Sequence, residues 1–386
     1  MASSDDSNST DRIPAFLPAG LEEDRSKFQI AVEILFLLLI WVLGIIGNVL
    51  VCIVIQRSRR VQSTTNYFVA SIALSDLILA FAGMPMVAGR VISDSWPFGD
   101  FMCRLVRFIH FFSPNVTMFI LTAISIDRFY TIIYPLSFKI TRGTAKRMIA
   151  CCWVFASLFS CLCFYFYSEK TVRSENGSNK TICPTYALPS DWSGIAYTLA
   201  LFLIQFFAPM IIMTVVYTRL FRYIWKTDKP MRRIQRTMNS VPRTKVKMVK
   251  MLMVLSVITV LLLAPMYIQQ LWFCIVMPPF VSPTIFIFCL WIGFSSSLAK
   301  PVIYMWCNSN FRRGCKEVFC MSAMRCYRSN TYAITNASTF GRKNHIGVME
   351  TADNITIDSP SKTFNRSVHI DRSAWPVGQS TPTTYV

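Results

Sequence analysis

The sequence predicts an all-α membrane protein: a seven-transmembrane helix bundle with a short amphipathic eighth helix. Two observations predict it, namely apolar stretches long enough to cross a bilayer and a charge bias between the loops that join them. Hydrophobic residues make up 53% of the 386 residues and charged residues only 15%, which is too apolar for a soluble chain of this length. A hydrocarbon core of about 30 Å needs roughly 20 residues of helix. Ile34–Ile55 supplies that length without a charge.

Each apolar stretch is expected to be a helix. Lipid offers the backbone no hydrogen-bond partners, and the stretches are too long and too uniformly apolar for barrel strands. In chain order, the predicted spans are Phe28–Ile55, Tyr67–Ile92, Phe101–Tyr134, Met148–Tyr167, Trp192–Trp225, Val246–Met277 and Phe280–Cys307.

The loop charges orient the predicted bundle. Residues 1–28 hold six acids against three cations, whereas the first loop holds three arginines and no acid. The region 219–250 carries many cations and one acid, Asp228. Because cytosolic loops are enriched in Lys and Arg, we expect a multi-pass plasma-membrane protein with its amino terminus outside the cell and its carboxyl terminus in the cytosol. The net charge of +19 does not indicate a nucleic-acid partner, since the cations flank spans instead of forming a basic domain.

Three parts follow from this topology. Residues 1–28 are expected to be an extracellular tail, residues 29–319 the bundle, and residues 320–386 a disordered cytosolic tail rich in Ser and Thr. Within the bundle, residues 308–319 place Phe311, Cys315 and Phe319 at four-residue steps. This spacing predicts an amphipathic helix that lies on the lipid of the inner leaflet.

Polar and helix-bending residues recur in order along the spans. They are Gly47-Asn48, Leu74-Ser75-Asp76, Asp127-Arg128-Phe129, Trp153, Pro209, Tyr217, Pro265 and Pro301-Val302-Ile303-Tyr304. On these motifs the chain resembles the rhodopsin-like (class A) G-protein-coupled receptors over about residues 29–320. Further segments resemble one orphan receptor within the peptide-receptor-like branch; among them are Asp127–Thr131, Tyr134–Lys139, Val241–Lys247, Asn310–Arg313 and Cys326–Asn330.

The resemblance implies roles for several residues. Arg128 is expected to leave Asp127 on activation and meet the carboxyl-terminal helix of a Gα subunit, with Tyr217 and Tyr304 turning inward in support. Phosphorylation of the tail and binding of arrestin are expected to follow. The resemblance also implies a disulfide between Cys103 and Cys183, with two free thiols as the alternative, because sequence alone does not establish connectivity.

Lys300 departs from the family pattern, because the resemblance implies an Asn or Asp before Pro301. The same resemblance implies that Asp76 helps to hold a sodium ion. A buried charge needs an opposite partner, so our hypothesis is that the Lys300 ammonium forms an intramembrane ion pair with Asp76 and excludes sodium. The alternative is that Lys300 reaches a wet cavity or becomes neutral.

The sixth span departs as well. Leu263 stands where the resemblance implies a Trp switch, and Thr259 stands where a Phe is usual. Lys245 replaces the acid that latches Arg128 in many relatives. Without this latch the inactive state loses a constraint, so signalling through a heterotrimeric G protein without ligand is predicted.

A ligand site is expected in the outer cavity. His110 occupies the position of the amine receptors' Asp, so a monoamine would lack its carboxylate anchor. By resemblance, the residues that face this cavity are Arg90, Arg107, His110, Tyr267, Gln270 and Trp272, together with Met86. This set has two arginines and no acid, which favours a peptide ligand with an anionic group; the alternative is that the arginines reach to the membrane interface. Ser168–Asp191 is long enough to form the hairpin that is common in this branch.

Several modification sites follow from the topology. Asn8, Asn176 and Asn179 begin external sequons and are predicted to be glycosylated, whereas Asn115 lies within a span and is predicted to stay bare. Cys320 and Cys326 follow the eighth helix and are candidates for palmitoylation, with free thiols as the alternative. Thr384, Tyr385 and Val386 fit strand addition to a PDZ domain.

Other classes of protein fit the sequence less well. A transporter or ion channel could use Asp76 and Lys300 as a path, but the odd number of spans and the lack of an inverted repeat oppose it. No catalytic arrangement indicates an enzyme, no cofactor is implied, and the scattered histidines make no metal site. A receptor-like partner that acts through heteromers without its own ligand remains the alternative.

Overall fold

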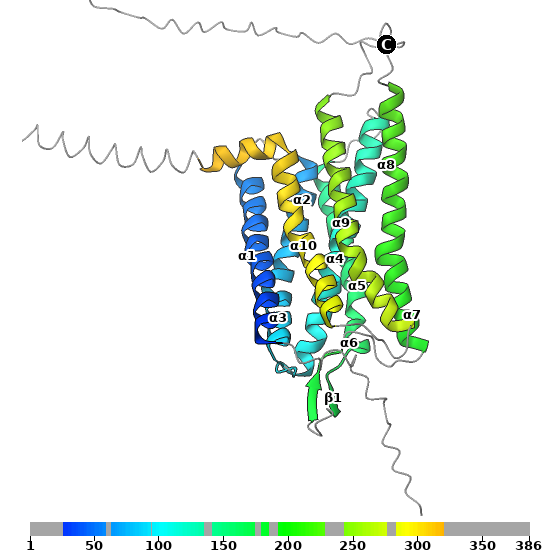
Figure 1. The fold of residues 1–386 in the computed structure, drawn as a ribbon. Coiled ribbons are helices and arrows are strands. Elements are labelled where there is room, and N and C mark those ends of the chain that lie inside the picture. Colours follow the sequence, from blue (N-terminus) through cyan, green and yellow to red (C-terminus); the bar gives the residue numbers. More distant parts are fainter. Residues whose placement is uncertain are drawn as a thin grey trace, which may run out of the picture. The chain divides into compact units, whose positions relative to one another are not determined.

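The computed structural model describes residues 26–58, 63–93, 95–134, 141–173, 179–184, 192–227, 243–275 and 283–319. These residues all belong to one compact unit, Met1–Arg325. Within them, seven helical stretches are long and apolar enough to cross a membrane. This confirms the predicted seven-helix bundle, which is drawn in Figure 1.

The stretches follow one another in the predicted order. They are α1 (Lys27–Arg57); α2 (Thr64–Ile78) with η2 (Leu79–Gly83) and α3 (Met84–Ile92); α4 (Gly99–Ile133); α5 (Arg142–Cys161) with α6 (Cys163–Phe166); α7 (Trp192–Leu201) with η3 (Phe202–Phe207) and α8 (Ala208–Thr227); α9 (Arg243–Ile275); and α10 (Pro283–Cys307).

The largest difference from the expected ends lies at α5. The sequence predicts a start at Met148, but the helix begins at Arg142, where the Thr141 side chain caps it by accepting a hydrogen bond from the Thr144 backbone N–H. Hydropathy marks where lipid contact begins, whereas backbone hydrogen bonding continues through charged turns outside the lipid. The helix is therefore longer than its apolar part.

Two wide π turns interrupt the helices, and each ends two residues before a proline. η2 ends at Gly83 before Pro85, and η3 ends at Phe207 before Pro209. A proline lacks an N–H group, and its ring would clash with the carbonyl oxygen four residues earlier in a regular helix. The wider turn removes this clash and lets each span continue.

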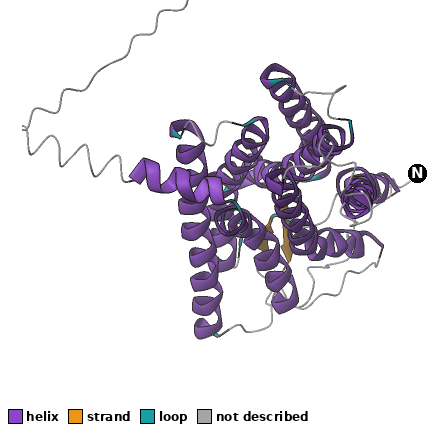
Figure 2. Cartoon of the chain, turned by 90° about the horizontal axis from the view of Figure 1, so that it is seen from above, coloured by secondary structure: helices purple, strands orange, loops and turns teal. Residues whose placement is uncertain are grey.

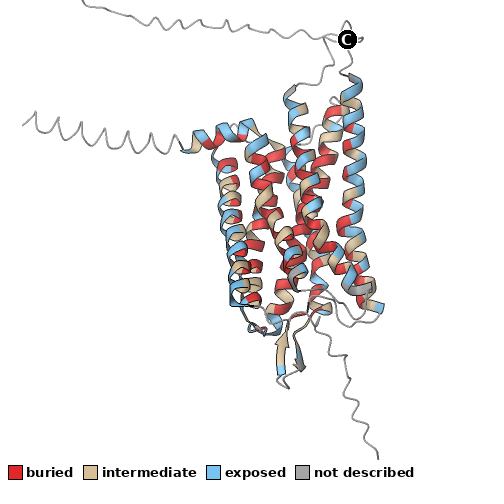
Figure 3. Ribbon diagram, viewed as in Figure 1, coloured by how far each residue is buried: buried red, intermediate tan, exposed pale blue. Residues whose placement is uncertain are grey.

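α4 is the central helix of the bundle. It is buried along most of its length, from Cys103 to Ile132, and it contacts α2, α5, α8 and α9. By contrast, α5 exposes large apolar side chains such as Phe155 and Leu158. Figure 3 shows that the buried faces point into the bundle and the exposed faces point away, and Figure 2 views the same helices from above. An exposed apolar surface is what lipid contact requires.

A short hairpin lies at one end of the bundle. β1 (Lys170–Arg173) pairs antiparallel with β2 (Asn179–Ile182), which bears out the predicted hairpin within Ser168–Asp191. The Cys103–Cys183 disulfide fastens it to α4, as the family resemblance implied. We call this end of the bundle the disulfide end, and the opposite end, which carries Arg128, the Arg128 end.

A further helical segment, residues 309–319, crosses the Arg128 end (Figure 1). The Asn308 side chain caps it by accepting hydrogen bonds from the backbone N–H groups of Asn310 and Phe311. Phe311 is buried against Tyr304, with ring centroids 4.8 Å apart, whereas Phe319 is 57% exposed. That this segment lies on a membrane surface stays a prediction.

Candidate functional site

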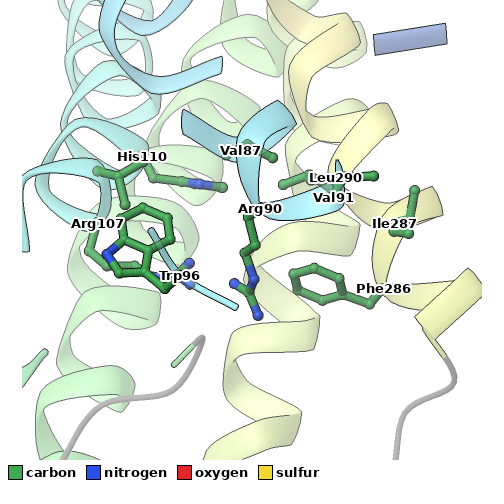
Figure 4. Close-up of a pocket in the computed structure, with 10 residues that line it drawn as sticks. Val87, Arg90, Val91, Trp96, Arg107, His110, Phe286, Ile287 and Leu290 are labelled. Atoms are coloured by element: carbon green, nitrogen blue, oxygen red, sulfur yellow. The ribbon is translucent and has the colours of Figure 1, made fainter. Parts of the chain in front are cut away.

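A cavity of about 40 Å³ opens between α3, α4 and α10 near the disulfide end. Figure 4 shows side chains from these elements around it. The ten residues that line it are Val87, Arg90, Val91, Trp96, Val106, Arg107, His110, Phe286, Ile287 and Leu290. Two arginines and one histidine thus stand among apolar walls.

The polar side chains of the cavity are held by specific contacts. The guanidinium carbon of Arg90 lies 5.5 Å from the Phe286 ring centroid, which is within cation–π range. His110 Nε2 lies 3.0 Å from the sulfur of Met266 on α9. Arg107 donates to the Cys183 carbonyl oxygen at 3.3 Å. The contacts join the cavity both to α9 and to the disulfide.

Trp96 reaches the cavity because the chain turns sharply before α4. Its indole N–H donates to the Gly99 carbonyl oxygen at 2.9 Å, and Gly99 has a φ of +79°, a conformation that favours glycine. The Trp96 backbone N–H also donates to the Thr181 carbonyl oxygen on β2 at 2.6 Å. The turn therefore ties the hairpin to the cavity wall.

The structure gathers only half of the expected ligand set at this cavity. Arg90, Arg107 and His110 line it, whereas Tyr267, Gln270 and Trp272 do not. Tyr267 is buried elsewhere, Gln270 is buried, and Trp272 is 50% exposed. The expected outer residue Met86 packs with the cluster around Trp96 and Cys103 instead.

Tyr267 belongs to a polar network inside the bundle. Its hydroxyl donates to the Asn115 side-chain oxygen at 2.7 Å, and the Asn115 amide donates to the Ser160 hydroxyl at 3.3 Å. The Tyr267 ring also stacks on Phe206, with centroids 4.8 Å apart. Asn115 is fully buried, which agrees with the expectation that its sequon stays bare.

Sequence reasoning missed the apolar residues of the cavity on α10. Phe286 and Leu290 stand one helical turn apart and face the same side as Phe294, whose ring lies 5.5 Å from that of His110. This four-residue spacing is visible in the sequence. It does not stand out there because the whole span is apolar.

A second group of charges lies in the middle of the bundle. Lys300 Nζ donates to Asp76 Oδ1 at 2.7 Å and to the Thr117 hydroxyl at 3.2 Å. All three residues are buried. The amide of Asn48 donates nearby to the Ser297 carbonyl oxygen at 3.1 Å. The group joins α2, α4 and α10, and α1 is joined to α10 beside it.

At the Arg128 end, Arg128 faces its neighbour in sequence. Arg128 Nε donates to Asp127 Oδ2 at 2.8 Å, and a second guanidinium nitrogen pairs with the same oxygen. Arg128 Nη1 also lies 3.7 Å from the sulfur of Met248 on α9. Two side chains in the described residues therefore hold this guanidinium, one acidic and one neutral.

The two tyrosines expected to support Arg128 are both buried at this end. The Tyr217 hydroxyl lies 3.3 Å from that of Ser256, and the Tyr304 hydroxyl donates to the Asn66 side chain. Leu263 and Thr259 are buried in α9, and Lys245 is exposed. In this state neither tyrosine hydroxyl bonds Arg128.

Among the residues predicted to be glycosylated, palmitoylated or bound by a PDZ domain, only Asn179 lies within the described ranges. Asn179 begins β2 and is exposed, as a glycosylated side chain must be. The other residues lie outside the described ranges; they are Asn8, Asn176, Cys320, Cys326, Thr384, Tyr385 and Val386.

Comparison with known proteins defines the class. The family described as 7 transmembrane receptor (rhodopsin family) matches residues 47–304. The chain therefore belongs to the rhodopsin family of seven-transmembrane receptors, which are receptors and not enzymes.

Within this family, the chain is similar over most of its length to a receptor from several mammals. Probable G-protein coupled receptor 19 of Homo sapiens is 43% identical over 361 residues, which cover 93% of this chain and 85% of that protein. Its Rattus norvegicus counterpart is 41% identical over 369 residues, covering 95% and 87%. The sequence motifs resemble this same receptor, so that interpretation is confirmed.

More distant relatives are named for peptides. Tachykinin-like peptides receptor 99D of Drosophila melanogaster is 30% identical over 281 residues, which cover 71% of this chain and 54% of that protein. Neuropeptide FF receptor 2 of Mus musculus is 29% identical over 322 residues, covering 79% and 76%.

Proposed function

We propose that this chain is a plasma-membrane receptor for a peptide and passes the signal to a heterotrimeric G protein. In this proposal the disulfide end lies outside the cell and the Arg128 end lies in the cytosol. The positive-inside charge bias supports this orientation, since the cation-rich loops flank the Arg128 end. Arrestin and a PDZ protein that takes Val386 are further partners in the same proposal.

One observation carries the coupling part of the proposal. Asp127 is buried, whereas the side chain of Arg128 is 12% exposed at the end of α4. The guanidinium therefore stands between a buried carboxylate and the open end of the bundle. Releasing it from Asp127 would present a cation with several N–H donors to a partner.

The contacts of Arg128 also support signalling without ligand. α9 meets this guanidinium through the neutral sulfur of Met248, and Lys245 on the same helix is a cation. A carboxylate on α9 would tie the two helices together by a charge-assisted contact. Because that tie is missing here, the inactive arrangement is favoured by less free energy, and a larger fraction of receptors is active at rest.

A peptide fits the disulfide end better than a monoamine does. The cavity-lining position on α4 holds His110 and no lining residue in the described part is acidic, so an ammonium ligand would meet only neutral and cationic groups. The names of the Drosophila and mouse relatives refer to peptides. The hairpin beside the cavity adds a backbone surface that a peptide could contact.

A nucleotide-exchange assay tests the proposed function. We expect the purified full-length receptor in lipid nanodiscs to accelerate GDP–GTP exchange on at least one Gα subunit without ligand. Arg128→Ala should abolish the acceleration, and Arg313→Ala, on the helical segment 309–319, serves as an exposed-cation control. A folded receptor that accelerates exchange on no Gα family would refute the proposal and favour a heteromer partner; exchange activity would in turn exclude a pure transporter.

A further inference from the structure

Arg107 is the most deeply buried arginine of the cavity. It lies one helical turn after Cys103 on α4 and is only 6% exposed. Figure 4 shows its side chain beside Trp96 at the cavity wall. Its guanidinium carbon lies 5.8 Å from the Tyr167 ring centroid, and Nη2 donates to the Cys183 carbonyl oxygen. Among the described residues, its Nε–H has no hydrogen-bond partner.

Within the part of the chain that the structure describes, no acid compensates the charge of Arg107. A guanidinium has five N–H donors, and one bond to a neutral carbonyl does not replace the water that burial removes. Arg104, one turn earlier on the same helix, shows the contrast. Its Nε bonds Asp100 at 2.7 Å in an exposed ion pair. The described residues thus supply an acid to the partly exposed Arg104 and not to the buried Arg107.

A second cation strengthens the positive potential around Arg107. Arg90 lines the same cavity, His110 is a buried ring between the two arginines and adds no charge, and none of the lining residues in the described part of the chain is acidic. The arginines would attract an anion that entered the cavity, and this anion could accept a hydrogen bond from the Arg107 Nε–H. Because the walls are otherwise apolar, the field is weakly screened there.

The size of the cavity limits which anion fits. Its volume of about 40 Å³ exceeds the roughly 10–15 Å³ that one water molecule needs. A group of a few heavy atoms can therefore enter, but a whole residue cannot. The planar fork of a guanidinium matches a carboxylate, which can accept two parallel hydrogen bonds. Trp96 and Phe286 offer apolar contact to whatever carries that group.

We propose that Arg107 is the anchor of a carboxylate-binding subsite, and that the ligand of this receptor places a carboxylate with an apolar neighbour there. This inference rests on the proposed receptor function and specifies its ligand chemistry. The carboxylate can be a peptide's free carboxyl terminus or the side chain of an Asp or Glu.

Thermal unfolding of the purified full-length receptor tests the subsite without a known ligand. The probes are N-acetyl-leucine, its uncharged match N-acetyl-leucinamide, and N-acetyl-aspartic acid α-amide, which carries the carboxylate on a side chain. All are compared at equal ionic strength. A compound that binds only the folded state raises the melting temperature. We expect the two carboxylates to raise the melting temperature and N-acetyl-leucinamide to leave it unchanged. The carboxylate with the larger shift identifies whether the subsite takes a carboxyl terminus or an acidic side chain.

Variants on α4 locate the effect. Arg107→Gln should weaken the apparent affinity for the effective carboxylate by about tenfold to hundredfold, as expected for loss of a charge-assisted pair. Arg107→Lys keeps the charge but loses the fork and should fall in between. Arg104→Gln, one turn away, should respond as the unmodified receptor does.

Two results would overturn the proposal. One is that neither carboxylate raises the melting temperature of the unmodified receptor more than N-acetyl-leucinamide does. This measurement does not depend on the folding of any variant. The other is an undiminished carboxylate response in folded Arg107→Gln. Nucleotide exchange is measured separately, so a receptor that binds carboxylate but activates no Gα refutes the proposed function while the subsite stands.

Discussion

Lys300 Nζ lies 2.7 Å from Asp76 Oδ1 in the middle of the bundle. The two residues are 224 positions apart in the chain and come from α10 and α2. An ion pair at this depth is expensive to form unless both charges find partners, and here the ammonium also donates to Thr117. The pair therefore cross-links α10 to α2, and the bond to Thr117 joins α10 to α4.

The first prediction concerns sodium. The Lys300 ammonium is already paired with the Asp76 carboxylate. A sodium ion that bound Asp76 would therefore have to displace this ammonium and leave it buried without an opposite charge. We expect basal nucleotide exchange to be unchanged when potassium is replaced by sodium at constant ionic strength. A sodium response that disappears in Asp76→Asn would contradict the pair's role.

The second prediction concerns the stability of the same pair. Lys300→Ala leaves Asp76 buried without its partner and should lower the free energy of unfolding by about 3–5 kcal/mol. The double variant Asp76→Asn, Lys300→Ala removes both charges and should recover part of this loss, as a double-mutant cycle with the two single variants Asp76→Asn and Lys300→Ala on melting curves would show. Thr117→Val, which deletes only the neutral acceptor, is the matched control. Additive effects of the two single changes would show that the charges are independent.

Sequence reasoning succeeded where one physical constraint acts alone. Hydropathy was enough to place the spans because lipid contact demands apolar length, and the need of a buried charge for a partner was enough to bring Lys300 to Asp76. It was not enough for the face of α9. The membrane-spanning part of that helix is apolar over most of its surface, so no polar stripe reveals which residues point inward. Tyr267 lies buried beside Asn115 and Trp272 is half exposed, so neither lines the cavity around Arg107; their contact with a ligand stays a prediction.

The third prediction follows from the position of Tyr267. Tyr267→Phe keeps the ring that stacks on Phe206 but removes the donor to the buried Asn115 side-chain oxygen. An unsatisfied buried acceptor costs about 1–3 kcal/mol, so the melting temperature should fall. Binding of N-acetyl-leucine should stay unchanged, because Tyr267 does not line the cavity. Weaker binding with unchanged stability would instead place Tyr267 at the ligand.

The fourth prediction concerns resting activity and the neutral contact between α9 and Arg128. Met248→Glu would place a carboxylate where a sulfur now lies 3.7 Å from Arg128 Nη1. A carboxylate there can accept from the guanidinium and tie α9 to α4, which favours the inactive arrangement. A gain of about 1.4 kcal/mol for that arrangement corresponds to a tenfold lower active fraction. We therefore expect basal nucleotide exchange to fall by about tenfold.

Met248→Gln is the matched control, because it has the same length and no charge. It should change basal exchange far less than Met248→Glu does, and high salt should weaken the Glu effect if the contact stays partly exposed. Lys245→Glu tests the position at which the family resemblance implies an acid and should act in the same direction. Equal activity of the Glu and Gln variants, with both receptors folded, would mean that a missing acid on α9 does not set the resting activity.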